Sequence, residues 1–131
     1  MIVVDTNVVI DLLLDVDSGR DSEELFTRDP DWVAPRLLSS ELSNVLVGFA
    51  RRNLLEPAAA AEVIGDAEAI FDGRLVEVSA SAAMAAALES GLSAYDAEYV
   101  VAARALGVRL ATRDGKILRT APDVAVAPAA A

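Results

Sequence analysis

Short β-branched segments alternate with helical segments along this chain, and that alternation limits the folds it can adopt. Strands joined through helices pair in parallel, with right-handed crossover connections. The sequence therefore predicts an α/β fold: a three-layer α/β/α sandwich around a mainly parallel sheet of about five strands. The expected strands are 2–4, 32–34, 75–78, 108–111 and 124–126.

The helical segments are bounded by residues that commonly begin and end helices. Ser79 and Ser93 are suitable N-caps, Pro57 suits a first helical position, and Gly91 and Gly107 suit helix ends. Two of the helices fall between the second and third strands, which predicts a helical hairpin on one face of the sheet. The expected helices are 8–14, 21–27, 36–52, 57–71, 79–91, 95–106 and 114–119, and residues 15–20 are polar and turn-like.

The length of 131 residues suits a single domain, 1–131, with a tail of alanine and proline from about residue 127 that we expect to fray. No apolar run approaches the ~18–20 residues that a membrane-spanning helix needs. The first residues meet an acid at Asp5 without a preceding basic segment, which is unlike a secretory signal. Without a long apolar run we expect no membrane contact, and without a secretory signal or a cysteine we expect a cytoplasmic protein.

Four acidic residues occupy positions where a carboxylate is either a helix cap or costly. Asp5 and Asp114 each follow a predicted strand, where ligands bind in open α/β sheets. Glu41 and Asp96 fall on the apolar faces of predicted helices. If these four carboxylates meet above the strand ends, they raise one another's pKa unless a cation compensates them.

Each acid also has a purely structural interpretation. Asp5 can be a plain N-cap, and Asp114 can form a cap or an Asx turn. Glu41 can be half of a buried ion pair with Arg52. Asp96 can complete a capping box with Ser93. The other acids have no comparable placement and are expected on the solvated surface: Asp11, Asp15, Glu23, Glu24, Glu56, Glu62 and Glu98.

The residue types missing from the chain narrow the chemistry. Because there is no histidine or cysteine, the sequence excludes Ser/His/Asp triads, Cys/His pairs and zinc sites built from nitrogen and sulfur. Carboxylates suit Mg²⁺ or Mn²⁺, which are used where phosphate oxygens are neutralised during hydrolysis. The net charge of −10 repels a nucleic acid, so contacts with one must be local, through arginines such as Arg51, Arg52, Arg113 and Arg119.

The ordered set of acidic tracts resembles that of the PIN-domain ribonucleases, and among them the small VapC-type toxins of type II toxin–antitoxin systems. The resemblance covers nearly the whole chain. It rests on Asp5-Thr6-Asn7, Ser39-Ser40-Glu41-Leu42, Ser93-Ala94-Tyr95-Asp96-Ala97-Glu98-Tyr99 and Thr112-Arg113-Asp114.

The resemblance implies a Mg²⁺- or Mn²⁺-dependent endoribonuclease in which Asp5, Glu41, Asp96 and Asp114 bind the metal. It assigns supporting roles to Asn7 and Thr112, and Arg113 is a candidate RNA contact. It also implies a homodimer and a cognate antitoxin. This antitoxin would lie in an apolar groove, for which 8–14 and 36–49 are candidate walls, and would reach the acids with a basic residue.

Two alternatives remain at this stage. One is a non-catalytic PIN-like scaffold that only binds a partner. The other is a magnesium-dependent phosphatase or receiver-like domain, which also gathers aspartates at strand ends. The phosphatase pattern has a second aspartate two residues after the first, where this chain has Asn7. A receiver has an early acidic pair and a late lysine, whereas the one lysine here, Lys116, closely follows Asp114.

Overall fold

The fold is a parallel sheet between helical layers, seen here in a computed structural model that describes residues 1–14 and 19–131. The strands are β1 (Ile2–Val4), β2 (Trp32–Pro35), β3 (Leu75–Val76), β4 (Leu110–Ala111) and β5 (Ala125–Val126). The helices in this part of the chain are α1 (Thr6–Leu13), α2 (Arg20–Arg28), α3 (Leu37–Arg51), α4 (Pro57–Ile70), α5 (Ala80–Ser90), α6 (Ala94–Leu106), α7 (Gly115–Thr120) and the short 3-10 helix η2 (Pro128–Ala130).

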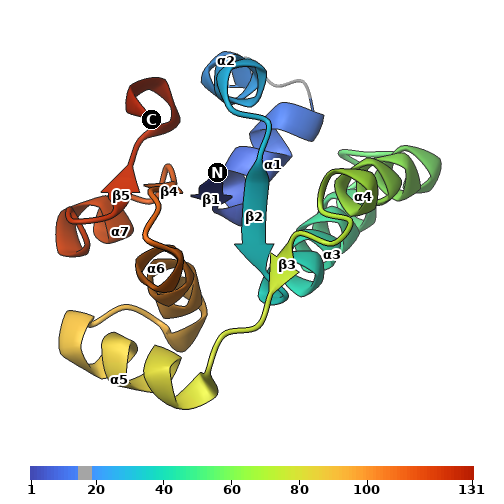
Figure 1. Cartoon of the computed structure of the whole chain (residues 1–131). Coiled ribbons are helices and arrows are strands. Elements are labelled where there is room, and N and C mark those ends of the chain that lie inside the picture. The colour runs from blue at the N-terminus through green and yellow to red at the C-terminus, as the bar shows by residue number, and fades with distance from the viewer. Residues whose placement is uncertain (15–18) are drawn as a thin grey trace.

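The sheet has the order β3-β2-β1-β4-β5, and all its strand pairs are parallel. The chain runs from β1 to β2 and β3 on one side, and β4 and β5 then lie on the other side of β1 (Figure 1). The strand order therefore reverses between β1 and β4. In such sheets the crevice at the carboxyl ends of these two strands is the usual ligand site.

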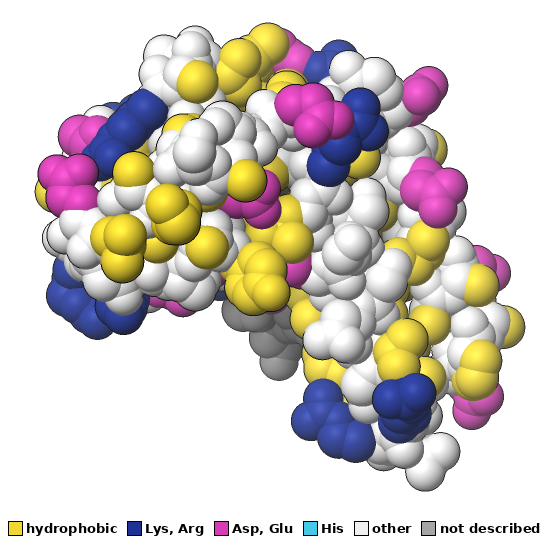
Figure 2. All heavy atoms as spheres, turned by 90° about the horizontal axis from the view of Figure 1, so that it is seen from below, with side chains coloured by type: hydrophobic (Ala, Val, Ile, Leu, Met, Phe, Trp, Pro, Cys, Tyr) yellow, Lys and Arg dark blue, Asp and Glu magenta, His cyan; other side chains and the backbone are white. Residues whose placement is uncertain are grey.

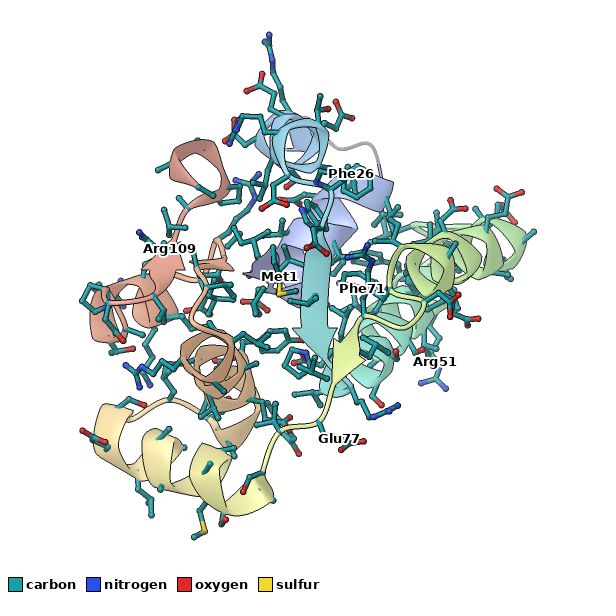
Figure 3. All side chains as sticks on the ribbon, in the orientation of Figure 1. Met1, Phe26, Arg51, Phe71, Glu77 and Arg109 are labelled. Atoms are coloured by element: carbon teal, nitrogen blue, oxygen red, sulfur yellow. The ribbon has the colours of Figure 1, made fainter. Side chains whose placement is uncertain are left out.

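The helices form two layers because the crossovers run in opposite directions along the sheet. Right-handed connections place α1 and α3 on one face and α6 and α7 on the other. Helix α6 contacts β1, β2 and β4, and α5 packs on α6 (Figure 1). The predicted helical hairpin is formed by α3 and α4, and the exposed Arg51 projects from it into solvent (Figure 3). The predicted three-layer fold is confirmed.

The core is dominated by small aliphatic residues around two large aromatic ones. Trp32 and Tyr99 are fully buried, and the ring of Phe26 meets Trp32 edge-on, with ring centroids 5.0 Å apart. Among the described residues, no helix is both long and apolar enough to cross a membrane.

The caps lie where the sequence places them. The Ser79 and Ser93 hydroxyls accept hydrogen bonds from the first turns of α5 and α6. Gly91 and Gly107 end these helices with φ angles of 78° and 67°, which favour glycine. Helix α1 begins two residues earlier than expected because Asp5, rather than a later residue, is its N-cap.

Three strands are shorter than expected, and β5 lacks only residue 124 of the expected segment 124–126. The segment 75–78 pairs only through residue 76, because its neighbour β2 ends at Pro35. In the segment 108–111 only residues 110 and 111 form the strand, paired with Val3 and Val4. Strand propensity alone could not show where the partner strand ends.

Helix α2 is one residue longer at each end than the expected 21–27. The segments on either side of it in space, the turn before it and the C-terminal tail, also differ from the expectation. Most of the turn expected at 15–20 lies outside the described residues, and α2 begins at Arg20. The tail from residue 127 was expected to fray, and this was wrong. It forms η2, in which Pro128 is buried against α2, and Arg28 donates a hydrogen bond to the Ala131 carbonyl oxygen. The apolar contact with α2 supplies the ordering that composition did not predict.

Candidate active site

Asp5 is the most buried of the four acids and lies directly after β1. Only 6% of it is exposed, and its Oδ1 accepts a hydrogen bond from the Thr6 backbone N–H at 2.7 Å. It is therefore the N-cap of α1, as the structural interpretation supposed. Burial, and to a lesser degree the charges of Glu41 and Asp96, raise its pKa to about 6 despite hydrogen bonds that favour the anion.

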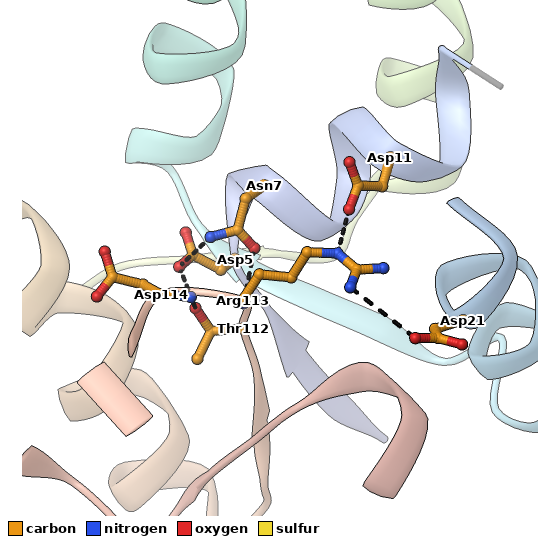
Figure 4. Close-up of polar contacts among 7 residues, drawn as sticks. All are labelled: Asp5, Asn7, Asp11, Asp21, Thr112, Arg113 and Asp114. Atoms are coloured by element: carbon orange, nitrogen blue, oxygen red, sulfur yellow. Dashed lines mark hydrogen bonds and ion pairs between the residues drawn. The ribbon is translucent and has the colours of Figure 1, made fainter. Parts of the chain in front are cut away.

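Two polar side chains hold the second oxygen of Asp5 (Figure 4). The buried Thr112 hydroxyl donates to Oδ2 at 2.7 Å, and Asn7 Nδ2 donates to the same oxygen at 3.2 Å. Asn7 Oδ1 in turn accepts from the Arg113 backbone N–H at 3.1 Å. The loop after β4 is thus connected to the loop after β1 through the carboxylate of Asp5.

Glu41 points toward this strand end rather than toward Arg52. Its Oε1 accepts hydrogen bonds from the Tyr99 hydroxyl at 2.6 Å and the Thr6 hydroxyl at 3.0 Å. Arg52 instead donates to the Gly48 carbonyl oxygen and lies over the Phe49 ring. The ion pair with Arg52, which was the alternative interpretation of Glu41, is not among the contacts of the described residues.

Asp96 lies on the first turn of α6 and faces the other acids. Its backbone N–H donates to the Ser93 hydroxyl at 3.0 Å, so one of the two bonds of a capping box is present. Its carboxylate is half-buried, and its pKa is raised by burial and by the charges of Asp114 and Glu41. Its side chain is therefore close enough to both acids to be affected by their charges.

Asp114 serves as the N-cap of α7. Its Oδ1 accepts from the backbone N–H groups of Lys116 and Ile117 at 2.8 and 3.0 Å, which is the predicted capping role. Its own backbone N–H donates to the Thr112 hydroxyl at 3.0 Å. Since its charge also raises the pKa of Asp96, Asp114 combines a capping role with a place beside the other acids.

No basic side chain of the described residues forms an ion pair with any of these four acids. The charge of Lys116 opposes the upward shift in the pKa of Asp96. Its Nζ donates to the Gly91 carbonyl oxygen at 2.6 Å. Arg113, expected as an RNA contact, turns away from the acids and pairs with Asp11 and Asp21 (Figure 4).

Acidic side chains lie in a hollow between two lobes when the molecule is viewed toward the strand ends (Figure 2). One lobe carries α5 and α6, and the other carries the α3–α4 hairpin. Glu41, Asp96 and Asp114 are each partly exposed, so an external ligand can approach them.

Four residues of this region were missed or assigned to the wrong environment by the sequence reasoning. Asp11 was expected on the solvated surface, but its side chain is 14% exposed and bonded to Arg113. Glu98 was expected there too, but it is half-buried, and burial and the charge of Glu41 raise its pKa. Thr6 and Tyr99 bind Glu41, and no local pattern signals contacts across 35 and 58 residues.

The four carboxylates are the right kind of ligand for a hard divalent cation, but their positions in this structure are not those of a complete metal site. All donors are oxygens, the charges are uncompensated, and one acid is almost fully buried. Within residues 1–14 and 19–131, however, no group of three or more acidic side chains is spaced to hold an ion. Side-chain rotation would have to complete the site.

Comparison with known proteins places the chain in a family. The model of the PIN domain matches residues 2–122. The crystal structure of PAE2754 from Pyrobaculum aerophilum is similar over 95% of this chain and 81% of that one, with a TM-score of 0.78 and 22% sequence identity. No curated protein matches the sequence significantly. At 22% identity the similarity to the solved structure supports the fold alone. Membership of the family rests on the match to the PIN domain model, which covers most of the chain. The chain belongs to the PIN domain family.

Proposed function

We propose that this protein is a cytoplasmic metal-dependent endoribonuclease that hydrolyses RNA phosphodiester bonds. PIN domains are usually nucleases, and they generally use divalent metal ions. The observation that carries the proposal is the group of four facing acids without a basic partner among the described residues, one of them buried with a pKa raised to about 6. An uncompensated arrangement of this kind is costly without a cation.

In this proposal Asp5, Glu41, Asp96 and Asp114 hold one or two Mg²⁺ or Mn²⁺ ions. A bound ion of this type supplies a lower pKa for water and stabilises negative charge on phosphate oxygens. Thr112 and Asn7 would orient Asp5, since both donate hydrogen bonds to its Oδ2. No side chain is required as a dedicated general base.

RNA cleavage by the purified protein tests the proposal. We expect cutting with Mg²⁺ or Mn²⁺ that stops with EDTA and is lost in Asp5→Asn and Asp96→Asn variants that remain folded. Asp66→Asn is a matched control, because Asp66 is an exposed aspartate on α4, outside the acidic group. Equal cleavage by Asp5→Asn and the parent protein would show that the activity arises elsewhere.

We further infer that the protein is the toxin of a toxin–antitoxin pair and acts as a homodimer. The apolar groove that supports an antitoxin lies between α3 and α4, with a volume of about 310 Å³. It is lined by Leu38, Leu42, Ile64, Phe71 and Leu75, with Glu68 and Asp72 also in its wall, and α1 does not contribute. Growth arrest on expression, relieved by a small neighbouring gene, tests the toxin role, and light scattering tests the dimer.

A non-catalytic scaffold is the second candidate. It is favoured by the spacing of the acids, which form no complete metal site among the described residues. A scaffold would bind its partner with the same affinity in the parent protein and in the Asp5→Asn variant. It would also be functional without metal. Tight partner binding without any metal-dependent RNA cleavage would favour this candidate.

A further inference from the structure

Tyr99 is a fully buried tyrosine whose hydroxyl points at one of the four acids. It lies on α6, and its OH donates to Glu41 Oε1 at 2.6 Å, a distance typical of the strong bond that a hydroxyl makes to a carboxylate. Tyr99 has no exposed surface, so its hydroxyl is shielded from water on the donor side of this bond. The hydroxyl is therefore held in one place by the packing of the ring.

Thr6 closes a three-way contact at the same oxygen. Its hydroxyl lies 3.0 Å from Glu41 Oε1 and 2.8 Å from the Tyr99 hydroxyl. Thr6 is 7% exposed and is the first residue of α1. Its backbone N–H binds Asp5, so one residue contacts two of the four acids.

The contact joins both helical layers above the end of β1. Glu41 comes from α3 on one face of the sheet, whereas Tyr99 comes from α6 on the opposite face. Both donors bind Oε1, and among the described residues no hydrogen bond uses Glu41 Oε2. The second oxygen is thus the one that Glu41 has available for an outside ligand.

We propose that Tyr99 and Thr6 are positioning residues that occupy one oxygen of Glu41 and thereby present its other oxygen to the acidic site. The proposal rests on the proposed function in one respect, namely that the outside ligand is a divalent cation. Partners that orient a metal ligand typically change metal affinity by about 10- to 100-fold when removed. Neither residue would contact RNA itself.

Tyr99→Phe is the sharpest test because it removes the hydroxyl and keeps the buried ring. Tyr95→Phe is the matched control, since Tyr95 is on the same helix one turn earlier and is 64% exposed. We expect Mn²⁺ affinity, measured by titration without RNA, to fall about 10-fold or more in Tyr99→Phe and to stay unchanged in Tyr95→Phe. Excess Mn²⁺ should restore RNA cleavage by Tyr99→Phe, which a loss of folding would not allow.

A double-mutant cycle separates positioning from general destabilisation. In a Glu41→Gln background, Tyr99→Phe should cause little further loss of Mn²⁺ affinity, because both changes act on the same carboxylate. Thr6→Val should weaken binding in the same direction as Tyr99→Phe. Unchanged Mn²⁺ affinity in a folded Tyr99→Phe protein would overturn the proposal.

Metal-free crystals make the test independent of the proposed function. In Tyr99→Phe crystals we expect Glu41 to leave the Thr6 hydroxyl or to adopt more than one conformer. If the parent protein binds no Mn²⁺ and cuts no RNA, the proposed function fails, and the Glu41 conformer still decides the positioning role. A Glu41 side chain unmoved in Tyr99→Phe crystals would overturn it.

Discussion

Arg113 donates a hydrogen bond from its guanidinium group to Asp11, one helical turn beyond Asn7 on α1. The same guanidinium lies 3.9 Å from Asp21 on α2. Because the Arg113 backbone N–H also binds Asn7, one residue connects the loop after β4 with two helices (Figure 4). This arrangement fixes the loop that carries Thr112 and Asp114.

The ion pair should contribute to stability. Asp11 and Arg113 are partly buried, with side-chain exposures of 14% and 29%, so solvent screens the pair less than a surface one. We expect Asp11→Asn and Arg113→Gln each to lower the free energy of unfolding by about 1 kcal/mol or more. Urea unfolding of both variants and their double mutant measures the coupling, and strictly additive effects would contradict a direct interaction.

The same pairing predicts how Arg113 affects RNA binding. Each arginine that neutralises a phosphate adds about one unit to the salt dependence of the binding constant. Because the Arg113 side chain faces Asp11 and Asp21, Arg113→Gln should leave that slope unchanged. Binding of RNA to a cleavage-deficient variant at several salt concentrations provides the measurement, and a slope reduced by one would restore Arg113 as a phosphate contact.

Asp5 predicts an unusual pH dependence for the metal-free protein. Its pKa rises from 3.8 to about 6 on folding, so the folded state binds this proton more tightly than the unfolded state. The contribution of Asp5 to the free energy of unfolding is therefore greatest below about pH 4 and is lost as the pH rises through about 6. The total change is about 3 kcal/mol. The raised pKa values of Asp96 and Glu98 act in the same direction.

Urea unfolding in EDTA at pH 5 and pH 7.5 tests this dependence. About 1 kcal/mol of the Asp5 contribution falls between these two values, and it should disappear in Asp5→Asn but persist in the control Asp66→Asn. Mg²⁺ should recover stability at pH 7.5 in the parent and not in Asp5→Asn. The same pH dependence in the parent and Asp5→Asn would show that Asp5 is not the group responsible.

Ser22 offers a stabilising substitution. Its side chain on α2 is fully buried, and among the described residues its hydroxyl has no hydrogen-bond partner. Because an unsatisfied buried hydroxyl is costly and alanine is the better helix former, Ser22→Ala should raise the unfolding free energy by about 1 kcal/mol. Thermal unfolding measures the change. A lower melting temperature would mean that the hydroxyl has a role in the folded protein.

The C-terminal tail should contribute measurably to the free energy of unfolding. Removal of residues 128–131 exposes the α2 surface that Pro128 covers and deletes the acceptor of the Arg28 hydrogen bond. We expect a loss of about 1–2 kcal/mol in unfolding free energy, mostly from the apolar contact. Arg28→Gln separates the two contributions, because the bond is exposed and should matter little. An unchanged melting temperature after truncation would show that η2 contributes nothing.

Much of this protein follows from short-range properties of its sequence. The alternation of strands and helices and the caps at Ser79 and Ser93 depend on residues within a few positions of one another, where periodicity and cap chemistry act. The place of Asp5 and Asp114 at strand ends also follows, because parallel strands share one carboxyl edge. The acidic tracts that resemble those of PIN domains could also be recognised from the sequence, because each consists of a few consecutive residues.

Contacts between distant residues were decided by the tertiary structure alone. Asp5 and Thr112 are 107 positions apart, and Glu41 and Tyr99 are 58 positions apart. Which donor meets which carboxylate depends on how the two helical layers and the strand ends come together, and no local pattern encodes that. The burial of Asp5, the turning of Arg113 toward Asp11 and the ordering of the tail on α2 likewise arise from packing between separate elements.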